Sequence, residues 1–131
     1  MATIKEDYVS FETAKLLKEK GFDESCYQKY DDEGYLSFNH VGYINSESPS
    51  DDFSALAPTH QMAMKWLREV CNLSVEVYRT ACGYVGCIVS IPSGTDIKFL
   101  EEDGDDLPSG TYTKWEYACE ATIKYCLEKL I

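Results

Sequence analysis

The stretch from Pro58 to Leu73, PTHQMAMKWLREVCNL, constrains the fold most, because its apolar residues cover an unusually wide arc of a helix. It begins at a proline and ends near Asn72, which can adopt the left-handed conformation that follows many helices. At about 100° per residue, the main apolar face consists of Thr59, Met62, Ala63, Trp66, Leu67 and Val70. His60, Met64 and Cys71 widen this face on one flank. Other helices of the same chain, or a second copy in a homodimer, must therefore cover this flank.

A first helix is predicted over residues 10–20, in SFETAKLLKEKG. Ser10 is the expected N-cap, because its side chain can accept a hydrogen bond from the first turn. Gly21 fits the left-handed position after the helix, where Phe22 can pack back on Leu17. The polar residues of this segment fall on the face opposite to Leu17, which predicts a helix with one buried side.

A last helix is predicted over residues 113–131. Thr113 and Glu116 have the spacing of a capping box, and Tyr112 and Tyr117 have the spacing of a hydrophobic staple. One apolar face runs down this helix, through Trp115, Ala118, Cys119, Thr122, Ile123, Cys126 and Leu130. We expect this face to pack on the core.

The segments between the helices predict strands. Residues 25–38 form a hairpin pattern around the glycine-containing turn Asp31–Gly34. Residues 74–80, 83–91 and 95–100 alternate and are separated by turns, which predicts a three-stranded meander. Its middle strand is apolar on both faces, and its third strand is expected to turn Ile97 and Phe99 inward.

The polar segments 39–57 and 101–110 are predicted to be loops. The resulting order is α-β-β-α-β-β-β-α, which is typical of an α+β fold with an antiparallel sheet and three helices packed mainly on one face. The length of 131 residues predicts one domain, residues 1–131.

Composition and charge limit the classes of partner. The formal net charge of −11 disfavours direct binding to nucleic acid or anionic membranes, because phosphate contacts need lysine and arginine. No apolar run has the length of a membrane span, and the N-terminus does not resemble a signal peptide. We therefore expect a cytoplasmic protein.

The six cysteines predict free thiols rather than a disulfide framework or a metal site. They are Cys26, Cys71, Cys82, Cys87, Cys119 and Cys126. No two of them form a C-x-x-C pair, and the expected compartment is reducing. We expect neither a metal nor another cofactor, and buried cysteines then act as small apolar residues.

Two sets of residues suggest other functions. His40 or His60 could serve a cysteine nucleophile as a base, which would make the chain a small enzyme. The acidic cluster Glu101, Glu102, Asp103, Asp105 and Asp106 could instead imitate the phosphates of DNA and inhibit an enzyme that processes nucleic acid. Neither set is embedded in a recognised catalytic or calcium-binding motif.

Three stretches carry a resemblance to a family: SFETAKLLKEKGFD, APTHQMAMKWLREV and YTKWEYACEATIKYCLEKLI. Together they resemble a group of small uncharacterised proteins from phage and prophage regions of gut Bacteroidetes. The group has no established activity, so no residue role is transferred from it. The resemblance implies a phage or mobile-element origin and expression inside a bacterial host cell.

These observations favour a non-enzymatic accessory protein that binds another protein of the host or phage. Its expected interaction residues are the helix flank His60, Met64 and Cys71 and the acidic cluster at 101–106. Tyrosine, of which the chain has ten, supplies contact area with a polar tip and suits such a role.

Overall fold

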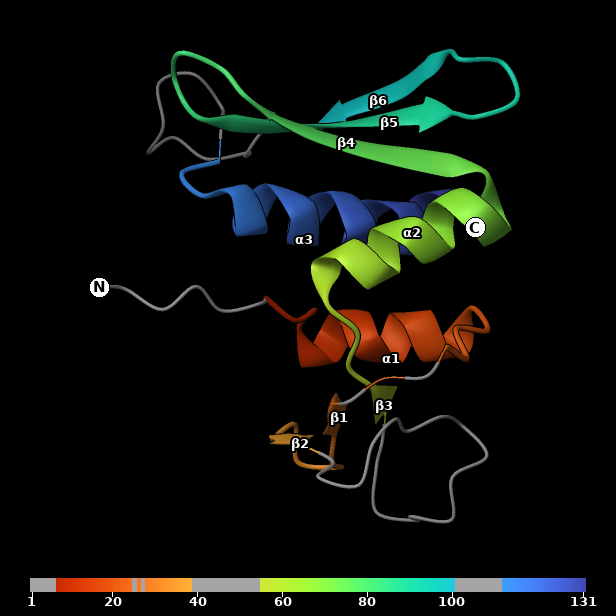
Figure 1. Cartoon of the computed structure of the whole chain (residues 1–131), viewed down its shortest axis with the longest axis vertical. Coiled ribbons are helices and arrows are strands. Elements are labelled where there is room, and N and C mark those ends of the chain that lie inside the picture. Colours follow the sequence, from red (N-terminus) through yellow and green to blue (C-terminus); the bar gives the residue numbers. More distant parts are fainter. Residues whose placement is uncertain (1–6, 25, 27, 39–54, 101–111) are drawn as a thin grey trace. The chain divides into compact units, whose positions relative to one another are not determined.

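The computed structural model describes residues 7–24, 26, 28–38, 55–100 and 112–131. Within them the fold is α+β, and the helices and strands follow the expected order, with one short strand added before the second helix (Figure 1). The contacts group the chain into two compact units, Met1–Ala63 and Met64–Ile131, and each is described by itself. The expectation of one domain stays a prediction.

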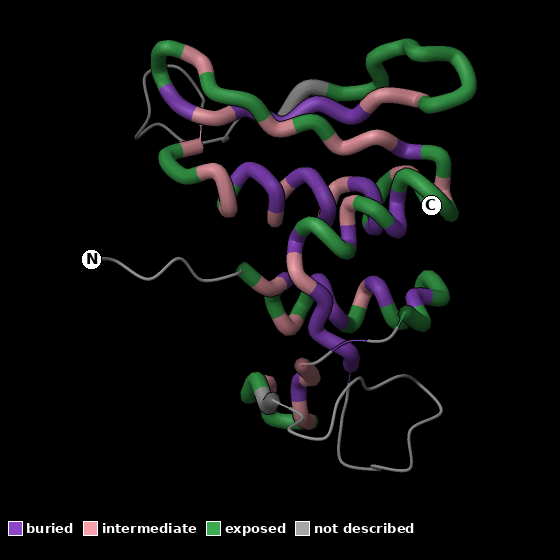
Figure 2. The backbone as a smooth tube through the Cα atoms, viewed as in Figure 1, coloured by how far each residue is buried: buried purple, intermediate pink, exposed green. Residues whose placement is uncertain are grey.

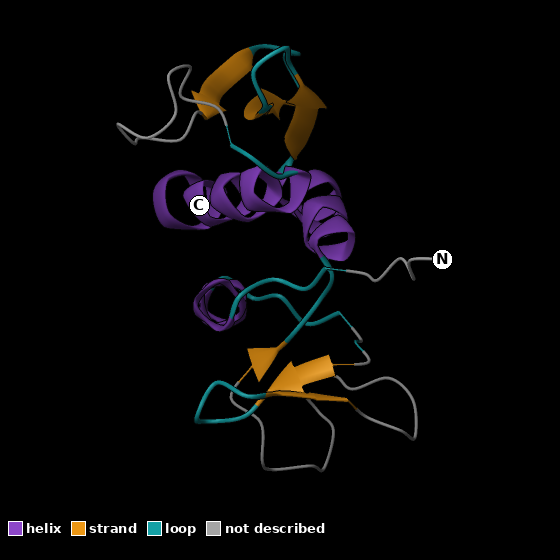
Figure 3. Cartoon of the chain, turned by 90° about the vertical axis from the view of Figure 1, so that its left-hand side faces the viewer, coloured by secondary structure: helices purple, strands orange, loops and turns teal. Residues whose placement is uncertain are grey.

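The strands form two antiparallel sheets rather than the single sheet that we expected, and each unit contains one of them (Figure 3). The alternation of residues identifies a strand and its two faces, but it does not specify which other strand pairs with it. The number of sheets therefore depends on tertiary pairing.

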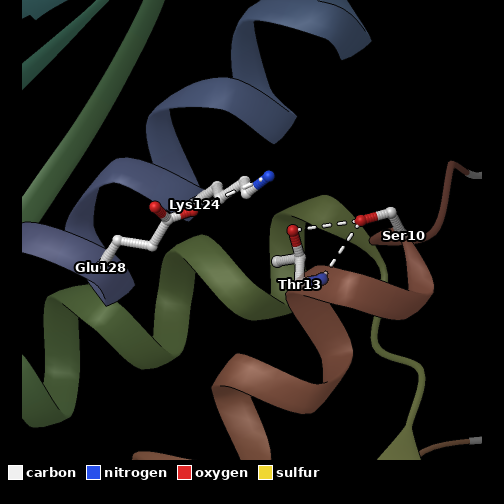
Figure 4. A network of polar contacts seen from close by, with 4 residues as sticks. All are labelled: Ser10, Thr13, Lys124 and Glu128. Atoms are coloured by element: carbon white, nitrogen blue, oxygen red, sulfur yellow. Dashed lines mark hydrogen bonds and ion pairs between the residues drawn. The ribbon is translucent and has the colours of Figure 1, made fainter.

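Helix α1 (Phe11–Glu19) has the predicted ends. The Ser10 side chain accepts a hydrogen bond from the backbone N–H of Thr13 at 3.2 Å (Figure 4). At the other end Gly21 has a φ of 93°, and the N–H of Phe22 donates to the carbonyl of Leu17 at 2.9 Å. This bond is the six-residue closure of a Schellman motif, as the sequence predicted.

The first sheet has the strand order β2-β1-β3. The hairpin of β1 (Gln28–Tyr30) and β2 (Leu36–Phe38) confirms the prediction for residues 25–38. Strand β3 (Ala55–Leu56) pairs with β1 and is buried, although it lies in a segment that we expected to be a polar loop. Its two apolar residues are too short a run to show alternation, and their backbone pairing with β1 is what identifies them as a strand.

Helix α2 (His60–Cys71) begins later than expected, because Thr59 caps it. The Thr59 hydroxyl accepts a hydrogen bond from the N–H of Met62 at 3.1 Å, so Thr59 precedes the helix instead of lying on its apolar face. Asn72 has a φ of 58° and ends the helix as predicted.

The buried side of α2 is rotated toward the flank that we expected to need a cover. Trp66 and Leu67 are buried as predicted, but Val70 is 58% exposed and Met62 is also exposed. His60, in contrast, is only 4% exposed. The helical pattern predicts a wide apolar arc, and packing against other segments of the chain buries only part of that arc.

The second sheet is the predicted meander, with the order β4-β5-β6. Its strands are β4 (Leu73–Arg79), β5 (Tyr84–Ser90) and β6 (Asp96–Leu100). The middle strand β5 is buried on both faces, as predicted. The expectation for Ile97 was wrong: it is 42% exposed, and the register of β5 and β6 passes from Lys98 to Asp96 without including it. The side chain of Phe99 lies outside the described residues.

Helix α3 (Trp115–Tyr125) begins one residue later than the capping box implied. Lys114 is the N-cap residue and makes no side-chain cap bond, so the predicted cap at Thr113 is wrong. The predicted staple is also absent, since Tyr117 is exposed and lies under the Lys114 ammonium, 5.5 Å from the ring centre. Tyr112 pairs instead with Tyr84 of β5 through two backbone hydrogen bonds of 2.8 Å, which hold the chain extended before the helix.

The last turns form a π-helix, Cys126–Leu130, whose Leu127 is buried together with Cys126. On the outside of these turns, Lys124 and Glu128 lie 3.7 Å apart as an ion pair (Figure 4). The wider π turn places Leu127 in the core although it lies beside the predicted apolar face.

Helix α3 packs on one face of the second sheet (Figures 1 and 3). The contact is close at Gly86, where a Cβ atom would collide with the Thr122 hydroxyl. Both α3 and β5 contain many buried residues (Figure 2). This packing determines which face of the sheet points toward α3.

Candidate interaction surface

The face of the second sheet that points away from α3 is the candidate site, and we call it the outer sheet face. Gly86 faces α3, and Val77 is its partner on β4, so both lie on the helix side. Because successive side chains alternate between the two faces, the neighbouring positions lie on the other side. The outer sheet face therefore carries Ser74, Glu76 and Tyr78 of β4, Val85, Cys87 and Val89 of β5, and Asp96 of β6.

Two carboxylates flank the only cysteine of this face. The Cys87 thiol donates to Oδ1 of Asp96 over 3.8 Å, and Glu76 is the cross-strand partner of Cys87. Burial raises the pKa of the Cys87 thiol, and Asp96 and Glu76 raise it further because a thiolate would be repelled by both. The centre of the outer sheet face is therefore acidic, and its thiol stays protonated at neutral pH.

An exposed aromatic side chain lies beside this acidic centre. Tyr78 is 46% exposed and lies opposite Val85, which is buried. Ser74 donates a hydrogen bond to Oε1 of Glu76 at 2.6 Å, which orients that exposed carboxylate. An exposed tyrosine and an exposed, oriented carboxylate on the same face can contact a protein partner that carries basic residues.

The predicted helix flank is largely covered within the chain. His60 is buried, and its backbone N–H donates to the carbonyl of Asp7 at 3.0 Å. Met64 and Cys71 are half-buried, and Cys71 lies near enough to Cys126 of the π-helix to raise the pKa of that thiol. A second chain could contact only the exposed parts of Met64 and Cys71 on this flank.

The predicted acidic cluster Glu101, Glu102, Asp103, Asp105 and Asp106 lies outside the described residues, as does His40. Imitation of DNA by the cluster, and a catalytic role for His40, stay predictions.

The six cysteines form no disulfide with one another in the structure, and four of them are buried. Burial raises the pKa of the Cys26 thiol to about 12, with a contribution from Glu24, and it raises that of Cys126 to about 12 with a contribution from Cys71. Burial also raises the pKa of Cys71. A cysteine nucleophile needs a lowered pKa, so these thiols and Cys87 have the opposite of the required environment.

In the described part of the chain, no three His, Cys, Asp or Glu side chains are grouped so that they could hold a metal ion. None of the helices found there combines the length and the apolar content needed to cross a membrane.

The outer sheet face was not identified from the sequence, although a signal for it was present. The alternation of Ser74, Glu76 and Tyr78 with apolar residues marks one side of β4 as polar. Asp96 could not be assigned to this side, because the shift in the register between β5 and β6 is not visible in the sequence.

Comparison with known proteins assigns no family to the chain. A scan against protein-family models finds no match, and searches against curated proteins and against solved structures find no significant similarity.

Proposed function

We propose that this chain is a non-enzymatic accessory protein of a phage or other mobile element, and that it acts in the bacterial cytoplasm by binding a basic protein. The observation that carries the proposal is the outer sheet face, where the exposed Tyr78 follows the exposed carboxylate of Glu76 on β4 and where Asp96 of β6 adds a second carboxylate next to Cys87. The mobile-element origin is supported by the resemblance of the three helical stretches described above.

The charges favour a basic partner over other proteins. A net charge of −11 attracts a positively charged protein over several ångströms and repels acidic ones. Contacts at Tyr78 then supply the apolar area, which charge alone does not. An enzymatic role is less well supported, because burial and neighbouring carboxylates keep four of the thiols protonated.

The test is affinity capture from a host lysate, followed by measurement of the dissociation constant with the purified partner. Glu76→Lys replaces attraction by repulsion, and Tyr78→Ala removes contact area. Each is expected to weaken binding by at least about tenfold, which corresponds to about 1.4 kcal/mol. Raising the salt concentration should also slow association.

The matched control is Glu69→Lys, because it makes the same change of charge at an exposed side chain of α2 outside the outer sheet face. It is expected to change the dissociation constant by no more than about twofold. If no captured protein loses affinity with Glu76→Lys or Tyr78→Ala, the proposed function is wrong.

A further inference from the structure

Strand β4 directs half of its backbone hydrogen-bonding groups away from the sheet. At one end the N–H of Ile91 donates to the carbonyl of Asn72 at 3.1 Å, and at the other end the N–H of Thr80 donates to the carbonyl of Gly83 at 2.6 Å. Both bonds fit the register that pairs Glu76 with Cys87. In an antiparallel pair, hydrogen-bonded and non-bonded positions alternate, so even-numbered residues of β4 bond to β5.

The odd-numbered residues therefore point their N–H and C=O groups toward the outer edge of β4. They are Leu73, Val75, Val77 and Arg79. A separate observation supports this assignment of odd-numbered residues to the outer edge. Tyr84, the partner of Arg79, forms its backbone hydrogen bonds to Tyr112 on the opposite side of β5. Residues 79 and 84 thus point away from each other, as a non-bonded pair does.

The two edges of the second sheet differ in whether another strand pairs with them. On one side of β5 lie β6 and the Tyr84–Tyr112 bridge. On the other side lies β4, and no described strand of the second unit pairs with its outer edge (Figures 1 and 3). Strand β4 is also regular, with seven residues, no proline and an unbroken register to β5. Proline and bulges, which protect many natural edges from pairing, do not protect this one.

Charge makes a second copy of the chain a poor occupant of this edge. If β4 paired over its whole length with β4 of a second copy, Leu73 would lie opposite Arg79 and Glu76 would lie opposite Glu76 of that copy. Two carboxylates directly opposite each other destabilise a strand pair, and each copy also has a net charge of −11. A strand with lysine or arginine next to Glu76 has the complementary charge.

We propose that the outer edge of β4 binds an extended, basic segment of the partner protein as an added strand. Backbone bonds to Val75 and Val77 hold the segment, and a lysine or arginine of the partner lies beside Glu76. This mode of recognition obtains affinity from the backbone and specificity from alternate side chains. This inference rests on the proposed function, and it specifies which part of the partner protein the chain recognises.

Hydrogen exchange in the wild-type protein tests the edge directly. The probe is a blocked seven-residue peptide that alternates threonine or valine with lysine or arginine, and its control has glutamate at the basic positions. Saturating basic peptide is expected to slow exchange of the Val75 and Val77 amides by at least about tenfold, as bonded amides exchange slowly. The amides of Ser74 and Glu76 already bond to β5 and should change little. Equal effects of both peptides, or no slowing at millimolar basic peptide, would overturn the proposal.

Val77→Pro tests the same edge by removing one outward N–H without removing a bond to β5. Proline is tolerated on edge strands for this reason. We expect this variant to lose at least about tenfold in affinity for the basic peptide, whereas the control Val77→Thr keeps the N–H and the affinity. If Val77→Pro does not fold, hydrogen exchange in the wild-type protein alone tests whether the peptide binds at the outer edge of β4.

The captured partner separates the two proposals. A partner that needs Glu76 and Tyr78 but binds Val77→Pro as tightly as the wild type contradicts the edge and leaves the proposed function intact. A partner that needs neither side chain contradicts the proposed function itself.

Discussion

Gly86 and Thr122 illustrate how closely α3 packs on the second sheet. A Cβ at position 86 would collide with the Thr122 hydroxyl, which itself donates to the carbonyl of Ala118 at 2.6 Å. Gly86→Ala is therefore expected to lower the free energy of unfolding by about 1–3 kcal/mol, the usual cost of overpacking. Urea unfolding of Gly86→Ala, Thr122→Ala and the double variant checks this, because the second substitution should recover part of the loss. Additive losses would contradict the contact.

The buried thiols of Cys26 and Cys126 make stability depend on pH. Each pKa is raised from 9.0 to about 12 in the folded protein. Below pH 9 both states hold the proton and the thiols contribute no pH dependence. Between pH 9 and 12 the unfolded state loses the proton first, so stability falls as pH rises, on the order of 1 kcal/mol per pH unit for each thiol. Urea unfolding from pH 8 to 11 should show a shallower fall for Cys126→Ala than for the wild type; equal slopes would contradict the raised pKa.

At the scale of the element, the two ends of the chain differ in how their helices begin. Ser10 caps α1 with its side chain, whereas Thr113 does not cap α3. Ser10→Ala should lower the unfolding free energy by about 0.5–2 kcal/mol, and Thr113→Ala should change it by only a few tenths. Thermal or urea unfolding of the two variants compares them directly. A larger loss of unfolding free energy with Thr113→Ala than with Ser10→Ala would mean that Thr113 caps α3, as the sequence predicts.

Helix α2 offers a second comparison between a buried and an exposed apolar residue. Leu67 is fully buried, and Val70, three residues later, is 58% exposed. Leu67→Ala is expected to cost about 2–5 kcal/mol, because it leaves a cavity in the core. Val70→Ala should cost less than about 1 kcal/mol, and chemical denaturation measures both. Similar losses for both variants would mean that Val70 is covered as the sequence first suggested.

At the scale of the whole molecule, charge governs association. The sequence has a pI of about 4.5 and a net charge of −11 at pH 7. Self-repulsion should keep the protein dispersed at pH 7, and light scattering should detect association as the pH approaches 4.5. Added salt at pH 7 should weaken binding to a basic partner, because it screens the attraction. Partner affinity that does not depend on salt would contradict the electrostatic part of the proposed function.

Much of the fold followed from local patterns, but the candidate site did not. The cap at Ser10, the left-handed residues Gly21 and Asn72, and the meander strands were each visible in a few neighbouring residues. The outer sheet face depends on residues from three strands, and Asp96 joins it through an irregular register. Periodicity carries no information about such a register, so this face could be recognised only in part.

The sequence alone determined the α+β class, the order of the main elements and the acidic charge, because these depend on composition and on interactions between near neighbours. Only the tertiary structure decided that the strands form two sheets, that His60 is buried while Val70 is exposed, and that Tyr112 pairs with Tyr84 in place of stapling a helix. The physical reason is that burial and strand pairing join residues far apart in the chain. A local pattern specifies which side chains can be buried, and the packing of distant segments selects which of them are.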